Sequence, residues 1–90
     1  MQLNSLKLLN FRNYDNLYID FNKKVNLLVG KNGQGKTNIV ESIYMLSFGK
    51  SFRTNKDKEI IKFDTESLYV GGSYTKYDTT SLIEVAIGKN

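Results

Sequence analysis

The chain has 90 residues, of which 40% are hydrophobic, so it holds one domain at most and is too apolar for a disordered protein. It contains no cysteine and no histidine, which excludes disulfides, zinc sites built on these residues and catalytic triads built on histidine. Thirteen Lys plus Arg against nine Asp plus Glu give a net charge of +4, which permits an anionic partner without requiring one.

The first part of the chain is predicted to form an antiparallel hairpin. Residues 3–11 set leucines among polar residues with a partial period of two, which indicates a half-buried strand. Residues 12–16 carry Asn and Asp side chains that favour a turn. Residues 17–21 alternate apolar and polar side chains, so a second strand is predicted there.

A buried strand and an amphipathic helix are predicted next. Residues 25–29, VNLLV, are apolar enough to be covered on both faces of a sheet. Residues 37–48 change to helical spacing, with their apolar side chains on one side. Gly49 is a natural C-terminal stop for this helix.

The remaining residues predict a basic loop and two further strands. Residues 50–57 are polar and basic, and residues 59–63 fit either a short helix or a strand. The apolar residues within 68–70 and 81–87 predict strands, separated by a connection over 74–78. Because no closing element follows the last strand, the chain is interpreted as the first part of a larger domain.

A phosphate-binding loop motif lies between the buried strand and the helix. It reads Gly30-Lys31-Asn32-Gly33-Gln34-Gly35-Lys36-Thr37 and fits G-x-x-x-x-G-K-[ST] at every specified position. The glycines let the chain curl around phosphates, and the start of the helix adds its dipole. Lys36 is expected at the β- and γ-phosphates, and the Thr37 hydroxyl is expected to bind Mg²⁺. A glycine-rich turn that binds nothing is the alternative, but the flanking strand and helix favour nucleotide binding.

No catalytic residue is expected within this chain. Hydrolysis needs a second acidic residue at a strand end and a group that orients the attacking water. None of the acidic residues after the motif follows a long apolar run, and Glu84 is expected to face solvent from its strand. The catalytic acid is therefore expected outside these residues.

Three blocks of sequence carry a family resemblance: residues 6–14 (LKLLNFRNY), 28–43 (LVGKNGQGKTNIVESI) and 46–54 (LSFGKSFRT). Through them the whole chain resembles the N-terminal part of the RecF family, bacterial DNA replication and repair ATPases related to the SMC and ABC ATPases. The resemblance implies an α/β P-loop NTPase fold of the ABC/SMC-like type, in which antiparallel strands precede the P-loop strand and helix. Residues 1–90 would then form the incomplete N-terminal part of one ATPase head.

The resemblance also assigns expected contacts to ATP. It implies that residues 30–37 and Asn38 bind the phosphates, with Thr37 also binding Mg²⁺. It places Arg12 near the nucleotide, with Asn13 as a further candidate, although Arg12 also fits an ordinary surface position at a strand end. The Walker B acid, the signature motif and most of the coiled arm are expected later in a longer protein.

The loop after the helix is a candidate DNA contact. Lys50, Arg53 and Lys56 give it a local positive charge, which suits contacts to DNA phosphates. A solvated loop with no partner fits the same composition equally well.

The function implied by the resemblance is an ATP-dependent homodimer with slow ATPase activity in the full-length protein. It would bind single-stranded and linear or gapped duplex DNA, act with RecO- and RecR-type mediator proteins in recombinase loading, and serve recombination and the SOS response. The alternative is an ABC transporter nucleotide-binding subunit or another SMC-like ATPase. A transporter subunit would carry a Gln after the helix, but none follows Gln34. No stretch suits a signal peptide or a membrane span, so a cytoplasmic location is expected.

Overall fold

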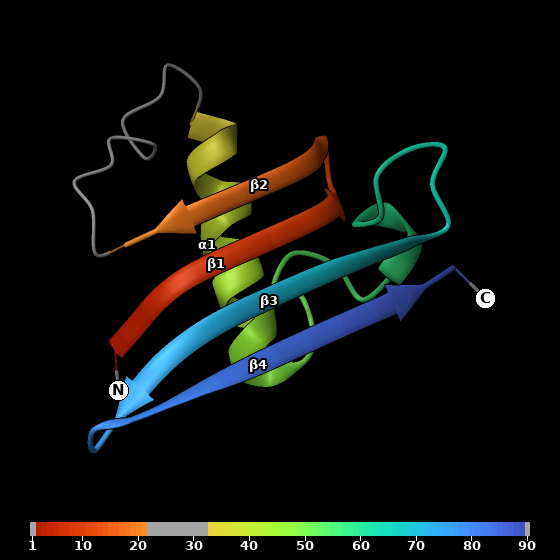
Figure 1. Cartoon of the computed structure of the whole chain (residues 1–90). Coiled ribbons are helices and arrows are strands. Elements are labelled where there is room, and N and C mark those ends of the chain that lie inside the picture. Colours follow the sequence, from red (N-terminus) through yellow and green to blue (C-terminus); the bar gives the residue numbers. More distant parts are fainter. Residues whose placement is uncertain (1, 22–32, 90) are drawn as a thin grey trace.

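The computed structural model describes residues 2–21 and 33–89 of the chain. These residues form the elements labelled in Figure 1: β1 (Gln2–Phe11), β2 (Tyr14–Asp20), α1 (Gly33–Phe48), the 3-10 helix η2 (Asp57–Glu59), β3 (Ser67–Lys76) and β4 (Thr79–Gly88). The strand predicted over residues 25–29 and the motif residues Gly30, Lys31 and Asn32 lie outside the described residues.

The four strands form one antiparallel sheet in the order β2-β1-β3-β4 (Figure 1). β1 and β2 make the hairpin that the sequence predicts, with Leu6 opposite Ile19. The other edge of β1 pairs with β3, which comes much later in the chain, and this pairing sets Leu6 opposite Gly72. β1 is therefore an inner strand with one local and one distant partner.

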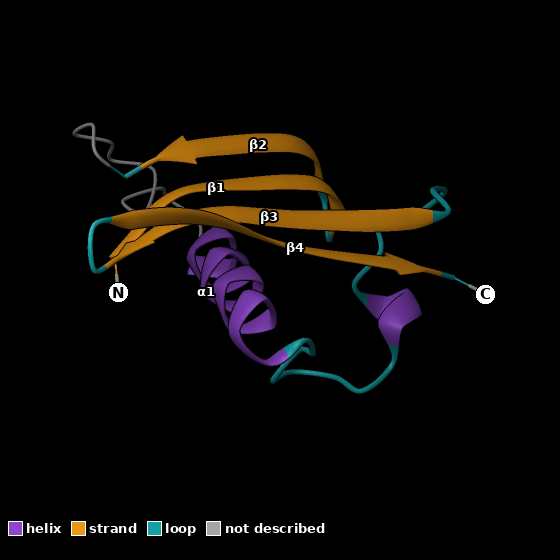
Figure 2. Cartoon of the chain, turned by 60° about the horizontal axis from the view of Figure 1, so that its bottom comes forward, coloured by secondary structure: helices purple, strands orange, loops and turns teal. Residues whose placement is uncertain are grey.

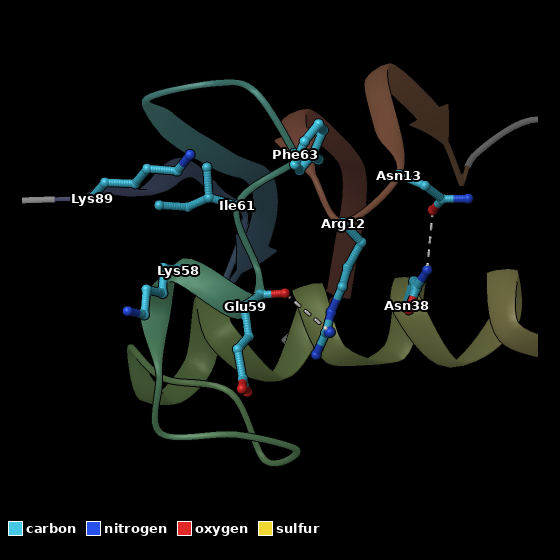
Figure 3. A pocket seen from close by; sticks show the side chains of 8 residues that line it. All are labelled: Arg12, Asn13, Asn38, Lys58, Glu59, Ile61, Phe63 and Lys89. Carbon is cyan, nitrogen blue, oxygen red and sulfur yellow. Dashed lines mark hydrogen bonds between the residues drawn. The ribbon is translucent and has the colours of Figure 1, made fainter.

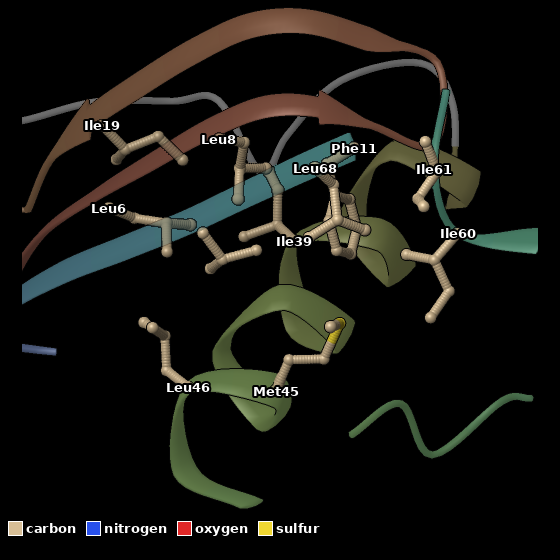
Figure 4. Close-up of a cluster of buried hydrophobic side chains, with 11 residues drawn as sticks. Leu6, Leu8, Phe11, Ile19, Ile39, Met45, Leu46, Ile60, Ile61 and Leu68 are labelled. Carbon is tan, nitrogen blue, oxygen red and sulfur yellow. The ribbon is translucent and has the colours of Figure 1, made fainter. Parts of the chain in front are cut away.

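The helix α1 packs across one face of this sheet (Figure 2). Because side chains alternate between the two faces of a strand, Leu6 and Leu8 of β1 and Leu68 and Val70 of β3 are buried on the side that α1 covers. Both layers supply the buried core drawn in Figure 4, which comprises Leu6, Leu8, Phe11, Ile19, Ile39, Met45, Leu46, Ile60, Ile61, Leu68 and Val70. Burying one such side chain stabilises a fold by about 1.5–3 kcal/mol, so this cluster fixes α1 against the sheet.

The helix is longer than its apolar spacing predicts. α1 already includes residues 33–36, which precede the predicted range of 37–48. These residues include two glycines, which have low helix propensity and carry no hydrophobic period. At the other end, Gly49 has a φ of 74° and donates its N–H to the carbonyl oxygen of Met45 at 2.7 Å. The predicted stop at Gly49 is confirmed.

Two predicted connections are wrong in length. The turn predicted over residues 12–16 spans only residues 12–13, and the connection predicted over 74–78 spans only residues 77–78. Tyr77 and Asp78 have φ values of 52° and 64°, as a type I′ hairpin turn requires. In both hairpins the pairing with a neighbouring strand overrides the turn preference of Asn, Asp and Lys side chains.

The segment that joins η2 to β3 lies along the end of β1. Residues 59–63, which fitted a helix or a strand, contain the last residue of η2 and a single bridge between Ile61 and Phe11. The backbone N–H of Arg12 donates to the carbonyl oxygen of Ile60 at 2.6 Å. This contact brings η2 next to the turn between β1 and β2.

Candidate functional site

The described part of the phosphate-loop motif lies in the first turns of α1. Residues 33–37 are helical, and Thr37, the last residue of the motif, is exposed. The next residue, Asn38, is only 2% exposed. The helix thus presents Thr37 to its surroundings while Asn38 joins the structure beneath it.

A buried carboxylate, Glu41, lies one helical turn after Asn38. Its side chain is fully buried. Arg12 approaches it with two parallel hydrogen bonds, from Nε to Oε1 at 3.0 Å and from Nη2 to Oε2 at 2.8 Å. Ser51 donates to Oε2 at 2.5 Å, and Arg53 donates from Nη1 to Oε1 at 3.1 Å. Arg12, Ser51 and Arg53 all donate hydrogen bonds to the carboxylate, and these bonds compensate its negative charge.

These donors set the ionisation of Glu41. Burial alone would raise its pKa, but the hydrogen bonds from Arg12 and Ser51 and the charges of Arg12 and Arg53 outweigh burial and lower the pKa below its ordinary value. Glu41 is therefore ionised at neutral pH. A carboxylate held in this way is not available as a metal ligand.

Asn38 extends this cluster toward the start of the helix. Its side-chain oxygen accepts a hydrogen bond from Nη1 of Arg53 at 2.7 Å. Its amide nitrogen donates to Oδ1 of Asn13 at 3.4 Å, a contact drawn in Figure 3. The structure therefore brings together Arg12 and Asn13 from the first turn, Asn38 from α1 and Arg53 from the loop that follows α1. We call Glu41 and the residues around it, namely Arg12, Asn13, Asn38, Ser51 and Arg53, the Glu41 cluster.

The Glu41 cluster includes Arg53 but not Lys50 or Lys56, the two lysines with which the sequence groups it. The Arg53 guanidinium lies on α1 beside Asn38, whereas Lys50 and Lys56 are exposed and form no ion pair among the described residues. Ser51 fixes the loop between Lys50 and Lys56, because its hydroxyl also accepts hydrogen bonds from the backbone N–H of Arg53 at 2.9 Å and of Thr54 at 3.3 Å. The DNA contacts of Lys50, Arg53 and Lys56 stay predictions.

A pocket of about 430 Å³ opens beside Arg12 and Asn38. Figure 3 shows its lining, formed by Arg12, Asn13, Asn38, Lys58, Glu59, Ile61, Phe63 and Lys89. Nη1 of Arg12 donates to the backbone oxygen of Glu59 at 3.2 Å at one wall. Phe63 is 89% exposed at another. A pocket of this size, with cationic, amide and aromatic groups, suits a small polar ligand.

The donor set fits a magnesium–phosphate group at Thr37 better than a metal held by protein carboxylates. The Thr37 hydroxyl would supply one oxygen ligand while the phosphates and water supply the others. Among the described residues, no group of three or more acidic side chains is placed to hold a metal ion. Any Mg²⁺ here would therefore depend on a phosphate ligand.

Sequence reasoning missed Glu41 and Ser51. A signal for Glu41 was present, because Asn38 and Glu41 are three residues apart and so lie on the same side of the helix as apolar residues of the core. Two polar residues on an inward helix face require partners. Arg12 and Arg53 are the only arginines in the sequence, and both contact this one carboxylate.

No helix among the described residues is both long and apolar enough to cross a membrane. This finding leaves the predicted cytoplasmic location as an expectation.

Comparisons with known proteins agree with the predicted resemblance. The protein named DNA replication and repair protein RecF from Clostridioides difficile (strain 630) is 72% identical over 90 residues, which is 100% of this chain and 24% of that protein. Its namesake from Clostridium acetobutylicum is 54% identical over 89 residues, or 99% of this chain and 24% of that protein. The chain thus spans about a quarter of the length of these curated relatives.

Solved structures lead to the same group. A structure described as the recombination mediator protein RecF-ATP in the RecFOR pathway superposes with a TM-score of 0.83 and 40% sequence identity, covering 97% of this chain and 24% of that one. The predicted fold and the predicted likeness to the N-terminal part of RecF are confirmed. The AAA domain family matches residues 5–90, and the chain accordingly belongs to the AAA domain family.

Proposed function

We propose that this chain is the ATP-binding, N-terminal part of one ATPase head in a DNA replication and repair protein of the RecF type. The observation that carries the proposal is the complete motif of residues 30–37, whose last five residues form the start of α1. The residue after the motif, Asn38, lies among Arg12, Asn13 and Arg53. The relatives that cover the whole chain are named for DNA replication and repair. The name of one solved relative includes ATP.

The nucleotide would lie with its phosphates at the start of α1. There the backbone N–H groups of the motif and the helix dipole favour negative charge, and Lys36 would contact the terminal phosphates. Mg²⁺, held by the Thr37 hydroxyl and the phosphates, would neutralise charge on the β- and γ-phosphates.

The full-length protein is expected to hydrolyse ATP slowly, with the catalytic acid supplied by residues beyond this chain. ATP would favour a homodimer, in which the signature motif of each subunit completes the site of the other. These features follow from the family resemblance, which also supports a cytoplasmic location and action with RecO- and RecR-type proteins.

DNA binding is proposed for the same protein, with single-stranded and linear or gapped duplex DNA as substrates. Recombinase loading, recombination and the SOS response are the processes it would serve. In this chain the exposed Lys50 and Lys56, on a loop that Ser51 anchors to α1, would contact phosphates. Such contacts release counterions, so binding should weaken steeply as salt increases.

The proposal is tested by retention of gapped duplex DNA by the full-length protein, with and without ATP. We expect ATP to promote retention in the wild-type protein. Lys36→Ala should abolish the ATP-dependent part, because the motif loses its mobile phosphate-binding charge. A double variant, Lys50→Ala with Lys56→Ala, should keep ATP binding but reduce DNA retention and its salt dependence. If retention is the same with Lys36→Ala as with the wild type, the proposed coupling of ATP to DNA is wrong.

A further inference from the structure

The Glu41 cluster joins three segments that are distant in the sequence. Arg12 comes from the turn between β1 and β2, where its φ of 55° is unusual for a residue other than glycine. Arg53 comes from the loop after α1 and reaches back to Asn38, fifteen residues earlier. Among the described residues, Glu41 is the only one whose side chain accepts hydrogen bonds from both arginine side chains. It therefore determines where the two guanidinium groups stand relative to each other and to α1.

The cluster has a surplus of positive charge. Two guanidinium groups share one carboxylate, and the other cluster residues, Asn13, Asn38 and Ser51, are neutral. The nearby Glu59 is exposed, and its carboxylate accepts a hydrogen bond from Thr54 instead. Among the described residues, Nε and Nη2 of Arg53 have no hydrogen-bond partner. The cluster thus retains one net positive charge and further N–H donors, which an anion can use.

The surplus charge lies beside the end of the motif that faces the terminal phosphates. Arg53 is hydrogen-bonded to Asn38, the residue after Thr37. A Thr at this motif position holds the Mg²⁺ that bridges the β- and γ-phosphates. The groups next to Thr37 are therefore closer to the terminal phosphate end of a nucleotide than to its base.

We propose that Glu41 is a positioning residue for ATP: it holds the guanidinium groups of Arg12 and Arg53 beside Thr37 and Asn38, where their surplus charge stabilises the terminal phosphate. This inference rests on the proposed ATP binding at residues 30–37. Glu41 itself does not touch the nucleotide. Its contribution is to fix two flexible arginine side chains in the orientation in which they favour ATP over ADP.

A positioning role and a simple charge effect give opposite results for Glu41→Gln. The substitution removes one negative charge and raises the net charge of the cluster from one to two. If only charge mattered, ATP would bind more tightly. If Glu41 positions the arginines, ATP binds less tightly, because a neutral amide cannot accept hydrogen bonds from both guanidinium groups as a carboxylate does.

The experiment measures ATP and ADP affinities of the full-length protein by calorimetry, together with its thermal midpoint. For Glu41→Gln we expect ATP affinity to fall about tenfold, the size of one lost charge-assisted hydrogen bond, with little change for ADP. Arg53→Gln should give the same pattern. The double variant, Glu41→Gln with Arg53→Gln, should bind ATP no more weakly than Arg53→Gln alone, because each substitution already disrupts the same arrangement of guanidinium groups. Glu66→Gln, at an exposed glutamate outside the cluster, is the control of matched charge and should bind both nucleotides normally.

Other outcomes are decisive as well. Equal losses for ATP and ADP, or a lower thermal midpoint with an unchanged ATP-to-ADP ratio, would show that Glu41 is only structural. Tighter ATP binding by Glu41→Gln would show a charge effect without positioning. If Glu41→Gln fails to fold, Arg53→Lys replaces it: this variant keeps the charge but loses the planar fork, and an unchanged ATP-to-ADP ratio overturns the proposal. Failure of the proposed ATP site is a separate result, seen as normal ATP binding by Lys36→Ala.

Discussion

Replacing Arg12 with alanine should destabilise the fold far more than removing an ordinary surface ion pair. Arg12 supplies two of the hydrogen bonds to Glu41, at 3.0 and 2.8 Å, and the Glu41 side chain is 0% exposed. Removing one partner of a buried pair costs about 3–5 kcal/mol, because the remaining charge is left without compensation. Since Arg53 and Ser51 still contact Glu41, we expect the lower end of that range, about 3 kcal/mol.

The chain offers a matched control in Lys62→Ala. Lys62 pairs with Asp15 at 3.1 Å, but Asp15 is 84% exposed, and exposed pairs contribute about 0–1 kcal/mol. Urea unfolding of the full-length protein and of both variants, followed for the domain that contains this chain, compares the two losses at pH 7. The ranking of the two variants tests whether burial decides the strength of these ion pairs.

The loss should also depend on pH. The pKa of Glu41 lies below its ordinary value of 4.5 in the folded protein, so its stabilising contribution is present above pH 4.5 and disappears as the pH falls through the lower folded pKa. Without Arg12, burial acts with less opposition and the pKa of Glu41 rises. Glu41 then takes up a proton more easily, and a neutral carboxyl needs no counter-charge, so the difference between Arg12→Ala and wild type should shrink in acid. A loss no larger than that of Lys62→Ala, or one that is the same at every pH, would refute the reasoning.

Two further predictions concern packing and the pocket. Gly72→Ala should lower the thermal midpoint, by the equivalent of about 1–3 kcal/mol for an overpacked core, because a Cβ at Gly72 would lie 2.6 Å from a methyl carbon of Leu46; an unchanged midpoint would mean that the end of the Leu46 side chain moves aside without cost. Phe63→Ala should weaken ATP binding about tenfold if the ring packs against the bound nucleotide. Phe52→Ala, at another exposed phenylalanine, is its control, and equal effects of both substitutions would exclude a specific role for the pocket.

The sequence predicts much of the fold because the decisive signals are local. Alternation in residues 3–11 and 17–21 predicts the β1–β2 hairpin, and Gly49 marks the end of α1. Strand lengths were underestimated, since residues 14–16 and 74–76 have turn-forming or polar side chains and become strands only by pairing with a neighbour. The adjacency of β1 and β3 has no local signal, because two distant segments must find the same edge.

The candidate site, like the fold, could be predicted from the sequence only where its signals are local. The motif is contiguous, so its chemistry can be read from spacing, and the resemblance adds Arg12, Asn13 and Asn38, which the structure brings together on one side of α1. The place of Glu41 on the inward side of α1 signals only that it needs partners; the partners themselves lie 29 and 12 residues away and become neighbours only after folding. The sequence groups Arg53 with the lysines of its loop, whereas in the structure its guanidinium donates hydrogen bonds to Asn38 and Glu41 on α1.

The strand order also constrains how the chain forms during synthesis. β1 and β2 are synthesised before β3, yet one edge of β1 is completed only by β3. At about 5–20 residues per second, several seconds pass between the synthesis of β1 and that of β3. During this time the newly made hairpin exposes the open edge of β1, and an unpaired edge of this kind recruits other strands. The β1–β2 hairpin therefore benefits from protection against aggregation until β3 has been made.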